Sequence, residues 1–348
     1  MTRSGKIGIA ITVLVTIVCI HTSNGQDLHF SQFFNSPLTT NPANTGFIPD
    51  ANYRFGVNYR NQWSSVPVPY KTYSVFGDAQ LLRDKWYYGW LGVGGVILQD
   101  EAGDGILKST KMYGSVAYHQ LLGNNSLLSL GFNGGVAMKR IDLSKLTFPS
   151  QFNDTYGKWF FDRALPSGEN FTSSSILYLD VQAGMNYAYF PTDNIYINVG
   201  FSAQHLNTPK ETFLEGGDNE IGRRYIGFLN ASIKVSPQVI VNPNAYYSNQ
   251  TGASEAVVGA WAAYNLSGPG GDYQLLGGAY YRLNDALIPL IGYQLRQWRL
   301  MFSYDVTVSS FSAADKRQGA YELSVVYLGL FPKSGSQFNK RTYLCPHF

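Results

Sequence analysis

Two neighbouring segments of this chain, residues 112–118 and 128–138, alternate between apolar and polar side chains with a period of two. In the second segment, large apolar side chains stand at every other position: Leu128, Leu130, Phe132, Val136 and Met138. The positions between them carry small or polar residues without charge until Lys139. Successive side chains of a β-strand point to opposite faces, so this period predicts strands. A bulky apolar face opposite a small, polar one is typical of a strand between lipid and a polar interior.

The same alternation begins at Tyr53 and returns along the chain. From there, aromatic and branched side chains alternate with Arg54, Gly56, Asn58 and Arg60. An arginine on a lipid-facing position costs about 2 to 4 kcal/mol near the middle of the bilayer. We therefore expect Arg54 and Arg60 to face the interior. The most regular apolar stripe lies in residues 176–190.

This periodicity predicts an all-β fold, a transmembrane outer-membrane β-barrel over residues 53–331. We expect about fourteen antiparallel strands, the first from Tyr53 and the others at residues 71–82, 86–99, 109–121, 127–141, 176–190, 195–206, 224–235, 239–248, 255–266, 273–283, 287–296, 299–308 and 319–331. An even number is required when both termini lie in the periplasm. The longest connections then fall at the outer end, as expected for such barrels.

Composition also indicates a membrane barrel. Charged residues make up 14% of the chain and aromatic residues 15%. After the N-terminal segment, no stretch approaches the roughly 18 apolar residues of a spanning helix. Removing Arg3 and Lys6 from the 26 basic residues leaves 24 against 23 acidic ones, a net charge of +1. Bulk electrostatic attraction to nucleic acid is therefore not expected.

The N-terminal residues 1–25 have the features of a cleaved secretory signal peptide: a basic start, an apolar core and small residues before the cleavage point. Lipidation at Cys19 is the less favoured alternative, because Val18 stands where a small residue would be expected. Removal of the signal leaves Cys345 as the only thiol, so no intramolecular disulfide can form.

Two irregular segments flank the expected strands. Residues 26–52 contain three prolines and no clear period, and we interpret them as an N-terminal leader. The apolar side chains of this leader would be unfavourable in water, so we expect them to pack inside the barrel mouth. We expect residues 332–348 to form a C-terminal periplasmic tail.

The sequence holds no recognisable catalytic, cofactor or metal site. The histidines of the mature chain are scattered, and no pair has metal-ligand spacing. A hydrolase site on the barrel wall, with Ser202 as nucleophile and His205 as base, is not favoured. Residues 100–105 lack the spacing of a calcium loop and are better interpreted as a tight outer turn. We expect a protein that is not an enzyme.

The longest connection, residues 142–175, contains seven aromatic residues, among them Trp159, Phe160 and Phe161. Two interpretations are open. The loop can fold inward and constrict the barrel, or it can present an apolar surface to a partner chain, because aromatic residues are enriched at binding hot spots.

The run HFSQFFNSPLTTNPANTG at residues 29–46, followed by YRNQW at residues 59–63, resembles the start of PorP/SprF outer-membrane proteins of the type IX secretion system in Bacteroidota. Residues 102–105, 145–151 and 303–309 and the closing CPHF fit the same family. From these motifs and the aromatic loop, the candidate residues for partner binding or for a plug are His29, Phe30, Ser31, Gln32, Phe33, Asn35, Pro37, Asn41, Pro42, Gly46, Arg60, Asn61, Gln62, Trp63, Trp159, Phe160, Phe161, Cys345, Pro346 and Phe348.

The resemblance implies a non-enzymatic outer-membrane barrel that works with type IX secretion components. It also implies export and surface attachment of secreted cargo, notably large adhesins including those of gliding motility, through the C-terminal sorting domain of the cargo. We expect residues 29–46 to plug or brace the periplasmic mouth, with the tail beside them. The alternative function is a porin or a hydrophobic-solute transporter, because about fourteen strands leave room for a lumen.

Overall fold

The computed structural model describes residues 27–331, apart from residues 50, 66–68, 84, 87, 104–105, 154–159, 268–271 and 311. The expected signal peptide and tail lie outside the described residues, and so do Trp159, Cys345, Pro346 and Phe348.

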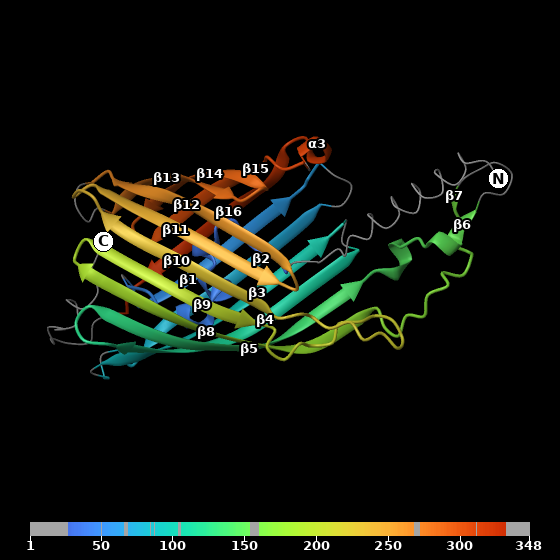
Figure 1. Ribbon diagram of the computed structural model, residues 1–348, viewed down its shortest axis with the longest axis horizontal. Helices are drawn as coiled ribbons and strands as arrows, with labels where there is room; N and C mark the ends of the chain where they lie inside the picture. The colour runs from blue at the N-terminus through green and yellow to red at the C-terminus, as the bar shows by residue number, and fades with distance from the viewer. Residues whose placement is uncertain are drawn as a thin grey trace, which may run out of the picture.

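Fourteen long antiparallel strands close into a barrel (Figure 1). They are β1 (Tyr53–Gln62), β2 (Tyr70–Leu81), β3 (Gly89–Ala102), β4 (Leu107–Leu121), β5 (Ser126–Ile141), β8 (Ser175–Thr192), β9 (Ile195–Gln204), β10 (Arg224–Lys234), β11 (Val239–Gln250), β12 (Ala253–Asn265), β13 (Tyr273–Arg282), β14 (Ala286–Leu295), β15 (Trp298–Thr307) and β16 (Gln318–Gly329). They pair in chain order, and β1 pairs with β16 to close the wall. A closed wall satisfies backbone hydrogen bonds within lipid. The predicted barrel of about fourteen strands is confirmed.

The third strand begins later than expected. We placed its start at Trp86, whereas β3 begins at Gly89. The amides of Lys85 and Trp86 both donate to the carbonyl oxygen of Leu82, which forms a turn that uses the backbone groups a strand would need.

The strands have one outward and one inward face, as their alternation predicted. Leu177 and Leu179 of β8 are 66% and 68% exposed on the outside of the barrel, whereas the next residue, Asp180, is on the inward face and fully buried. In β1, Phe55 points outward and Arg60 is buried inside. The lumen side therefore carries the polar and charged side chains, and the lipid side carries the apolar ones.

The two rims of the barrel differ. One rim, called here the short-turn end, holds the turns after β2, β4, β8, β10, β12 and β14 together with the chain on either side of the barrel, residues 52 and 330. The opposite rim, the long-loop end, holds the connections after β5 and β9 and the short helix α3 (Ser312–Asp315). In outer-membrane barrels short turns face the periplasm and long loops face outward. The short-turn end is accordingly the periplasmic one.

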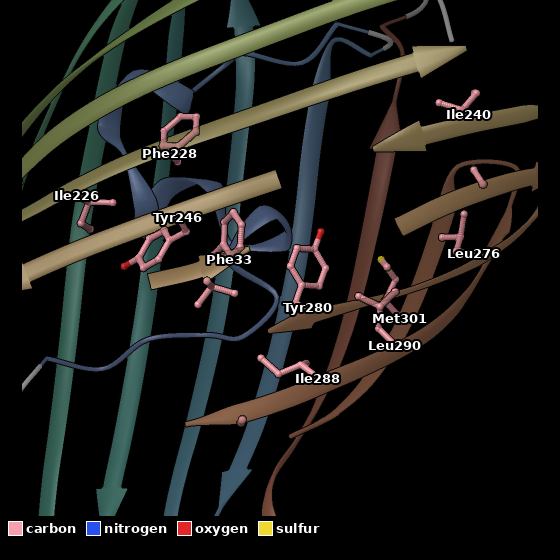
Figure 2. Packing of buried hydrophobic residues seen from close by; sticks show 13 residues of the cluster. Phe33, Ile226, Phe228, Ile240, Tyr246, Leu276, Tyr280, Ile288, Leu290 and Met301 are labelled. Carbon is pink, nitrogen blue, oxygen red and sulfur yellow. The ribbon is translucent and has the colours of Figure 1, made fainter. Parts of the chain in front are cut away.

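The leader lies inside the barrel and not beside it. It forms three single turns: η1 (Phe33–Asn35), α2 (Pro37–Thr40) and η2 (Pro42–Asn44). Phe33 belongs to an apolar cluster on the β10–β15 side, where its ring lies 5.1 Å from Tyr246 and 6.0 Å from Tyr280 (Figure 2). Phe30 packs in a second cluster with Phe76 of β2 and Leu98 of β3. Within the part of the chain that is described, no helix is long and apolar enough to cross a membrane.

At the long-loop end, two connections extend past the other strands (Figure 1). β8 pairs with β5 from Ser175 to Tyr189, while its ladder with β9 starts only at Ala183. The connection between β5 and β8 carries a small sheet of β6 (Phe152–Asn153) and β7 (Phe160–Phe161). An antiparallel bridge between Phe171 and Leu214 joins this connection to the one after β9.

Candidate functional site

The leader runs along the lumen from the long-loop half to the short-turn end. Its first described residue, Asp27, contacts Lys111 of β4 and His205, which directly follows β9 at the long-loop rim. Gly46, near its other end, donates its amide to Asp78 of β2 at 2.7 Å. We expected residues 29–46 at the periplasmic mouth, and their contacts extend further, well into the outer half of the lumen.

A group of buried charges in the outer half holds the residues Ser31 and Gln32; we call this group the arginine clamp, formed by Arg60, Arg282, Asp305 and Glu322. The amides of Ser31 and Gln32 donate to the Glu322 carboxylate at 2.6 and 2.9 Å. The hydroxyl of Ser31 donates to Asp305 at 2.7 Å. Arg60 pairs with both carboxylates, and Arg282 donates to Asp305 at 3.0 Å. Because these side chains are buried, each charge depends on its partners.

A second charged contact holds the first leader residue, Asp27. Lys111 donates to both of its carboxylate oxygens, at 2.6 and 2.7 Å. His205 lies between two carboxylates, with Nε2 at 3.2 Å from Asp27 and Nδ1 at 3.0 Å from Asp180. Burial raises the pKa of Asp27, but Lys111 and His205 outweigh it and hold that pKa well below its usual value. Burial lowers the pKa of His205, and its bonds to Asp180 and Asp27 outweigh that effect and raise it.

Amide contacts hold the middle of the leader against β5, β8 and β9. The side-chain amide of Asn41 donates to Asn186 at 2.8 Å and to the carbonyl oxygen of Phe201 at 3.0 Å. Pro42 lies directly against Gly131 of β5, where an added Cβ would come within 2.3 Å of its carbonyl carbon. Only glycine allows the two backbones to approach this closely.

The last part of the leader packs on a buried histidine, His119 of β4. The Nε2 atom of His119 lies 2.8 Å from the carbonyl oxygen of Thr45. Trp90 stacks on the His119 ring at 4.8 Å and donates its indole N–H to the carbonyl oxygen of Gly46 at 3.0 Å. Gly46 has a φ of +67°, a conformation that side chains with a Cβ rarely adopt.

Beside the leader, the lumen keeps a cavity of about 320 Å³ in its periplasmic half. It is bounded by the leader on one side and by β1 and β9 to β16 on the other, and its lining is rich in amides: Asn44, Asn198, Asn230, Asn242, Asn244, Gln274 and Gln294. Aromatic rings of Phe34, Tyr196 and Trp261 complete it. Two of these amides each bury an atom that has no hydrogen-bond partner, Asn198 Oδ1 and Asn242 Nδ2. An unpaired buried polar atom costs about 1 to 3 kcal/mol, so it needs an explanation.

The aromatic outer loop lies far from these contacts. Phe160 and Phe161 of β7 are 47% and 50% exposed, and Phe152 of the paired β6 is 44% exposed. The rings of Phe152 and Phe161 lie 5.3 Å apart. In the described part of the loop these side chains are therefore accessible to a partner.

The structure therefore brings together some candidate residues and separates others. His29, Phe30, Ser31, Gln32, Phe33, Asn35, Pro37, Asn41, Pro42, Gly46 and Arg60 lie in the lumen. Asn61, Gln62 and Trp63 lie at the long-loop rim, where Asn61 donates to the hydroxyl of Tyr321 at 3.0 Å. Ser202 donates to the carbonyl oxygen of Thr40 and not to His205, so the two do not form a nucleophile and base. The described residues contain no group of three or more His, Cys, Asp or Glu arranged for a metal ion.

Sequence reasoning missed the wall residues that hold the leader. Lys111, Asp180, Asp305 and Glu322 all stand on inward positions of strands, where a charge is costly unless it is paired. A charged residue on the face opposite an apolar stripe is the sequence signal that indicates an inward wall residue. We used this signal only for Arg54 and Arg60 of β1.

A family model described as "Type IX secretion system membrane protein PorP/SprF" matches residues 22–327. The chain belongs to this family. The match confirms the resemblance of the leader motif and covers the whole described barrel up to Tyr327. This PorP/SprF protein is therefore an outer-membrane barrel of the type IX secretion system. No match was found among curated proteins.

Two of the solved structures with a similar fold are toluene transporters. The toluene transporter TbuX of Ralstonia pickettii aligns with a TM-score of 0.50 at 11% identity, over 86% of this chain and 94% of that one. The P. putida toluene transporter TodX aligns with a TM-score of 0.50 at 12% identity, over 86% and 95%. At such low identity the similarity shows that this PorP/SprF chain shares their barrel fold, and nothing more.

Proposed function

We propose that this barrel binds a secreted surface protein at its long-loop end, through the C-terminal sorting domain of that cargo, and contacts other type IX components at its periplasmic end. Membership of the PorP/SprF family supports a role in this secretion system. The observation that carries the proposal is the exposed aromatic surface of β6 and β7. Large exposed apolar patches on a protein mark sites of interaction with other proteins.

The shape of the long-loop end supports protein binding. The connection that holds Phe152, Phe160 and Phe161 is joined to the connection after β9 by the Phe171–Leu214 bridge, and Leu214 is itself 41% exposed. The two connections together offer a broad surface with rings that are preorganised by strand pairing. A preorganised surface loses less conformational entropy on binding.

The alternative is passage of a small hydrophobic solute through the barrel. The shared fold with the toluene transporters favours it, but the leader lies along the lumen and is bonded to the wall by charges and amides. We expect the full chain to be silent in planar bilayers. Toluene-dependent binding or steady conductance of the purified barrel would favour the alternative.

The test is a mild-detergent affinity purification of the tagged protein from its host, read by mass spectrometry. We expect one large surface protein in the eluate of the unaltered chain. The triple substitution Phe152→Ser, Phe160→Ser, Phe161→Ser should lower its recovery by about tenfold or more, the effect of losing hot-spot aromatics. The matched control replaces polar residues of the adjoining connection, Glu215→Ser and Asp218→Ser. Equal recovery from the triple variant and the control would exclude this surface as the cargo site.

A further inference from the structure

A group of basic side chains lies on the outer face of the barrel wall at the long-loop end. They stand on the strands β2 to β5 and on the connection that follows: Lys71, Lys108, Arg140 and Lys145. Together with Glu101 of β3 and Asp142 they line a groove of about 670 Å³, which we call the basic groove. Four positive and two negative charges leave its described lining with a net charge of +2.

Strand pairing brings these side chains together. Lys71 of β2 pairs in register with Glu101 of β3, which pairs with Lys108 of β4. Lys108 pairs with Arg140 of β5. Each of the four follows the period of the exposed residues on its own strand, so each points outward. Adjacent strands lie about 4.8 Å apart, so these long side chains share a short stretch of the wall.

Two of the cations, Lys71 and Arg140, make no hydrogen bond or ion pair with any described residue. Lys108 pairs with Glu101 at 2.8 Å, but its side chain is 48% exposed. Exposed ion pairs of this kind contribute little to stability, so Lys108 can exchange Glu101 for a stronger anion. The groove therefore carries positive charge that the described part of the chain does not balance.

The basic groove begins where the apolar surface of the wall ends. On β5, the outward positions before Arg140 are all apolar: Leu128, Leu130, Phe132, Gly134, Val136 and Met138. The ten residue steps from the first to the last cover on the order of 33 Å of strand, or roughly 25 Å along the barrel axis at a tilt of about 40°. The apolar band of an outer-membrane barrel is about 25 Å tall. Arg140 therefore stands at the outer surface of the bilayer, where the lipid headgroups begin.

The rest of the wall differs at this rim. On each of the described strands β9 to β16, the two outward positions nearest the long-loop end carry no charge. Several of them hold tyrosine: Tyr225, Tyr247, Tyr281, Tyr304 and Tyr321. Tyrosine at this depth forms the usual aromatic girdle, which suits any bilayer surface. Cations gathered over four neighbouring strands instead favour an anion at one place on the wall.

We propose that the basic groove binds the phosphorylated sugar headgroup of an outer-leaflet glycolipid of the lipid A class. Arginine binds a phosphate through two parallel hydrogen bonds, and lysine binds it as a point charge. The groove has about twenty times the volume of a water molecule, roughly 30 Å³, so it has room for a sugar beside the phosphate. The acyl chains of the lipid lie along the apolar outward side chains of the same strands. This site goes beyond the proposed cargo binding and does not depend on it, because it concerns the lipid-facing wall.

Titration of the purified full chain with bisphosphorylated lipid A in detergent micelles, read by native mass spectrometry, tests the proposal. The triple variant Lys71→Gln, Lys108→Gln, Arg140→Gln removes three exposed cations of the groove. The matched control removes two exposed lysines and one exposed arginine at the same rim that do not line it: Lys210→Gln, Lys316→Gln and Arg223→Gln. We expect the dissociation constant for lipid A to rise about a hundredfold in the triple variant and to stay within about twofold in the control.

A single change guards against a folding defect in the triple variant. Lys71→Gln removes one exposed side chain that no described residue contacts by a hydrogen bond or ion pair, so the barrel should fold as before. It should weaken lipid A binding about fivefold. Heat-modifiable migration in gel electrophoresis checks that each variant is a folded barrel.

Further probes identify the source of the negative charge. Dephosphorylated lipid A should bind the unaltered chain at least tenfold more weakly than the bisphosphorylated form, and inorganic phosphate alone should bind more weakly still, because it has no acyl chains. Equal affinity for the two lipid forms, equally strong binding of inorganic phosphate, or equal losses in the triple variant and its control would overturn the proposal. A triple variant that keeps lipid A but loses a protein partner in affinity purification from the host would assign the groove to an acidic protein surface and overturn it as well.

Discussion

The two halves of the leader are held in the lumen by different kinds of contact. In the outer half, backbone amides of Ser31 and Gln32 and the carboxylate of Asp27 bind charged wall residues. In the periplasmic half, Asn41, Pro42 and residues 45–47 rely mainly on neutral amides, stacked rings and close backbone approach, and the amide of Gly46 adds one bond to the Asp78 carboxylate. The first half should therefore respond more strongly to the loss of a charge, and the second more strongly to a change of volume.

This difference has a structural reason. Before η1 the leader has no helix or strand, and the amides of Ser31 and Gln32 are satisfied by the wall, where the Glu322 carboxylate is a strong acceptor for them. The periplasmic half forms the turns α2 and η2, which satisfy part of their own backbone. It can therefore lie directly on the glycine-rich wall. The outer half is therefore held by wall carboxylates that accept from its amides, and the periplasmic half is held mainly by close packing on the wall.

The largest effect is expected from breaking the arginine clamp. Arg60→Met keeps much of the side-chain volume but leaves Glu322 and Asp305 with fewer positive partners in a buried site. Removal of one member of a buried ion pair costs about 3 to 5 kcal/mol. We expect a loss of that size in the free energy of unfolding, measured by urea titration of the refolded barrel in detergent micelles.

The control for this prediction is an exposed ion pair on the same barrel. Lys108 pairs with Glu101 at 2.8 Å near the long-loop rim, and Lys108→Met should cost less than about 1 kcal/mol. Similar losses for Arg60→Met and Lys108→Met would mean that the clamp does not fix the leader.

A smaller effect is expected from adding volume under the periplasmic half. Gly131→Ala places a methyl group within 2.3 Å of the Pro42 backbone, so the leader must shift. Overpacking of this kind costs about 1 to 3 kcal/mol. Gly227→Ala is the matched control, because a Cβ on that strand glycine meets nothing within 4 Å. We expect protease cleavage of the leader to increase in the first variant alone; unchanged protection would contradict the close packing.

The barrel could be predicted from the sequence because lipid forces a period of two on every strand. Leu177, Leu179 and their alternation partners carry that signal locally, so strand number and facing followed from short windows. The start of β3 was placed wrongly because the aromatic residues from Trp86 resemble the start of a strand. The turn at Leu82 depends on backbone hydrogen bonds that the side-chain pattern does not indicate.

The site was harder to predict, because its contacts join residues far apart in sequence. Ser31 and Glu322 meet across the lumen, and no local pattern links them. The leader was recognised as irregular and apolar, which indicated burial. Its polar partners were not recognised, since a single Asp305 or Asp180 in a strand gives no indication of which segment it binds.

The smallest expected effect concerns the pH dependence of the outer contact. The raised pKa of His205 means that its charge stabilises the fold fully below pH 6.5, its usual value, and that this stabilisation is lost as pH rises through the raised pKa. The lowered pKa of Asp27 means that its contribution is present above 3.8 and is lost as pH falls through the lowered pKa. His205→Gln keeps a hydrogen bond without the charge, so it should cost about 1 kcal/mol between those two values and less at alkaline pH. Urea titrations of both proteins at a pH inside that window and at alkaline pH measure this difference. A cost that stays the same at both would show that His205 holds Asp27 as a neutral ring, and the outer half of the leader would then depend on Lys111 and the arginine clamp for its charge.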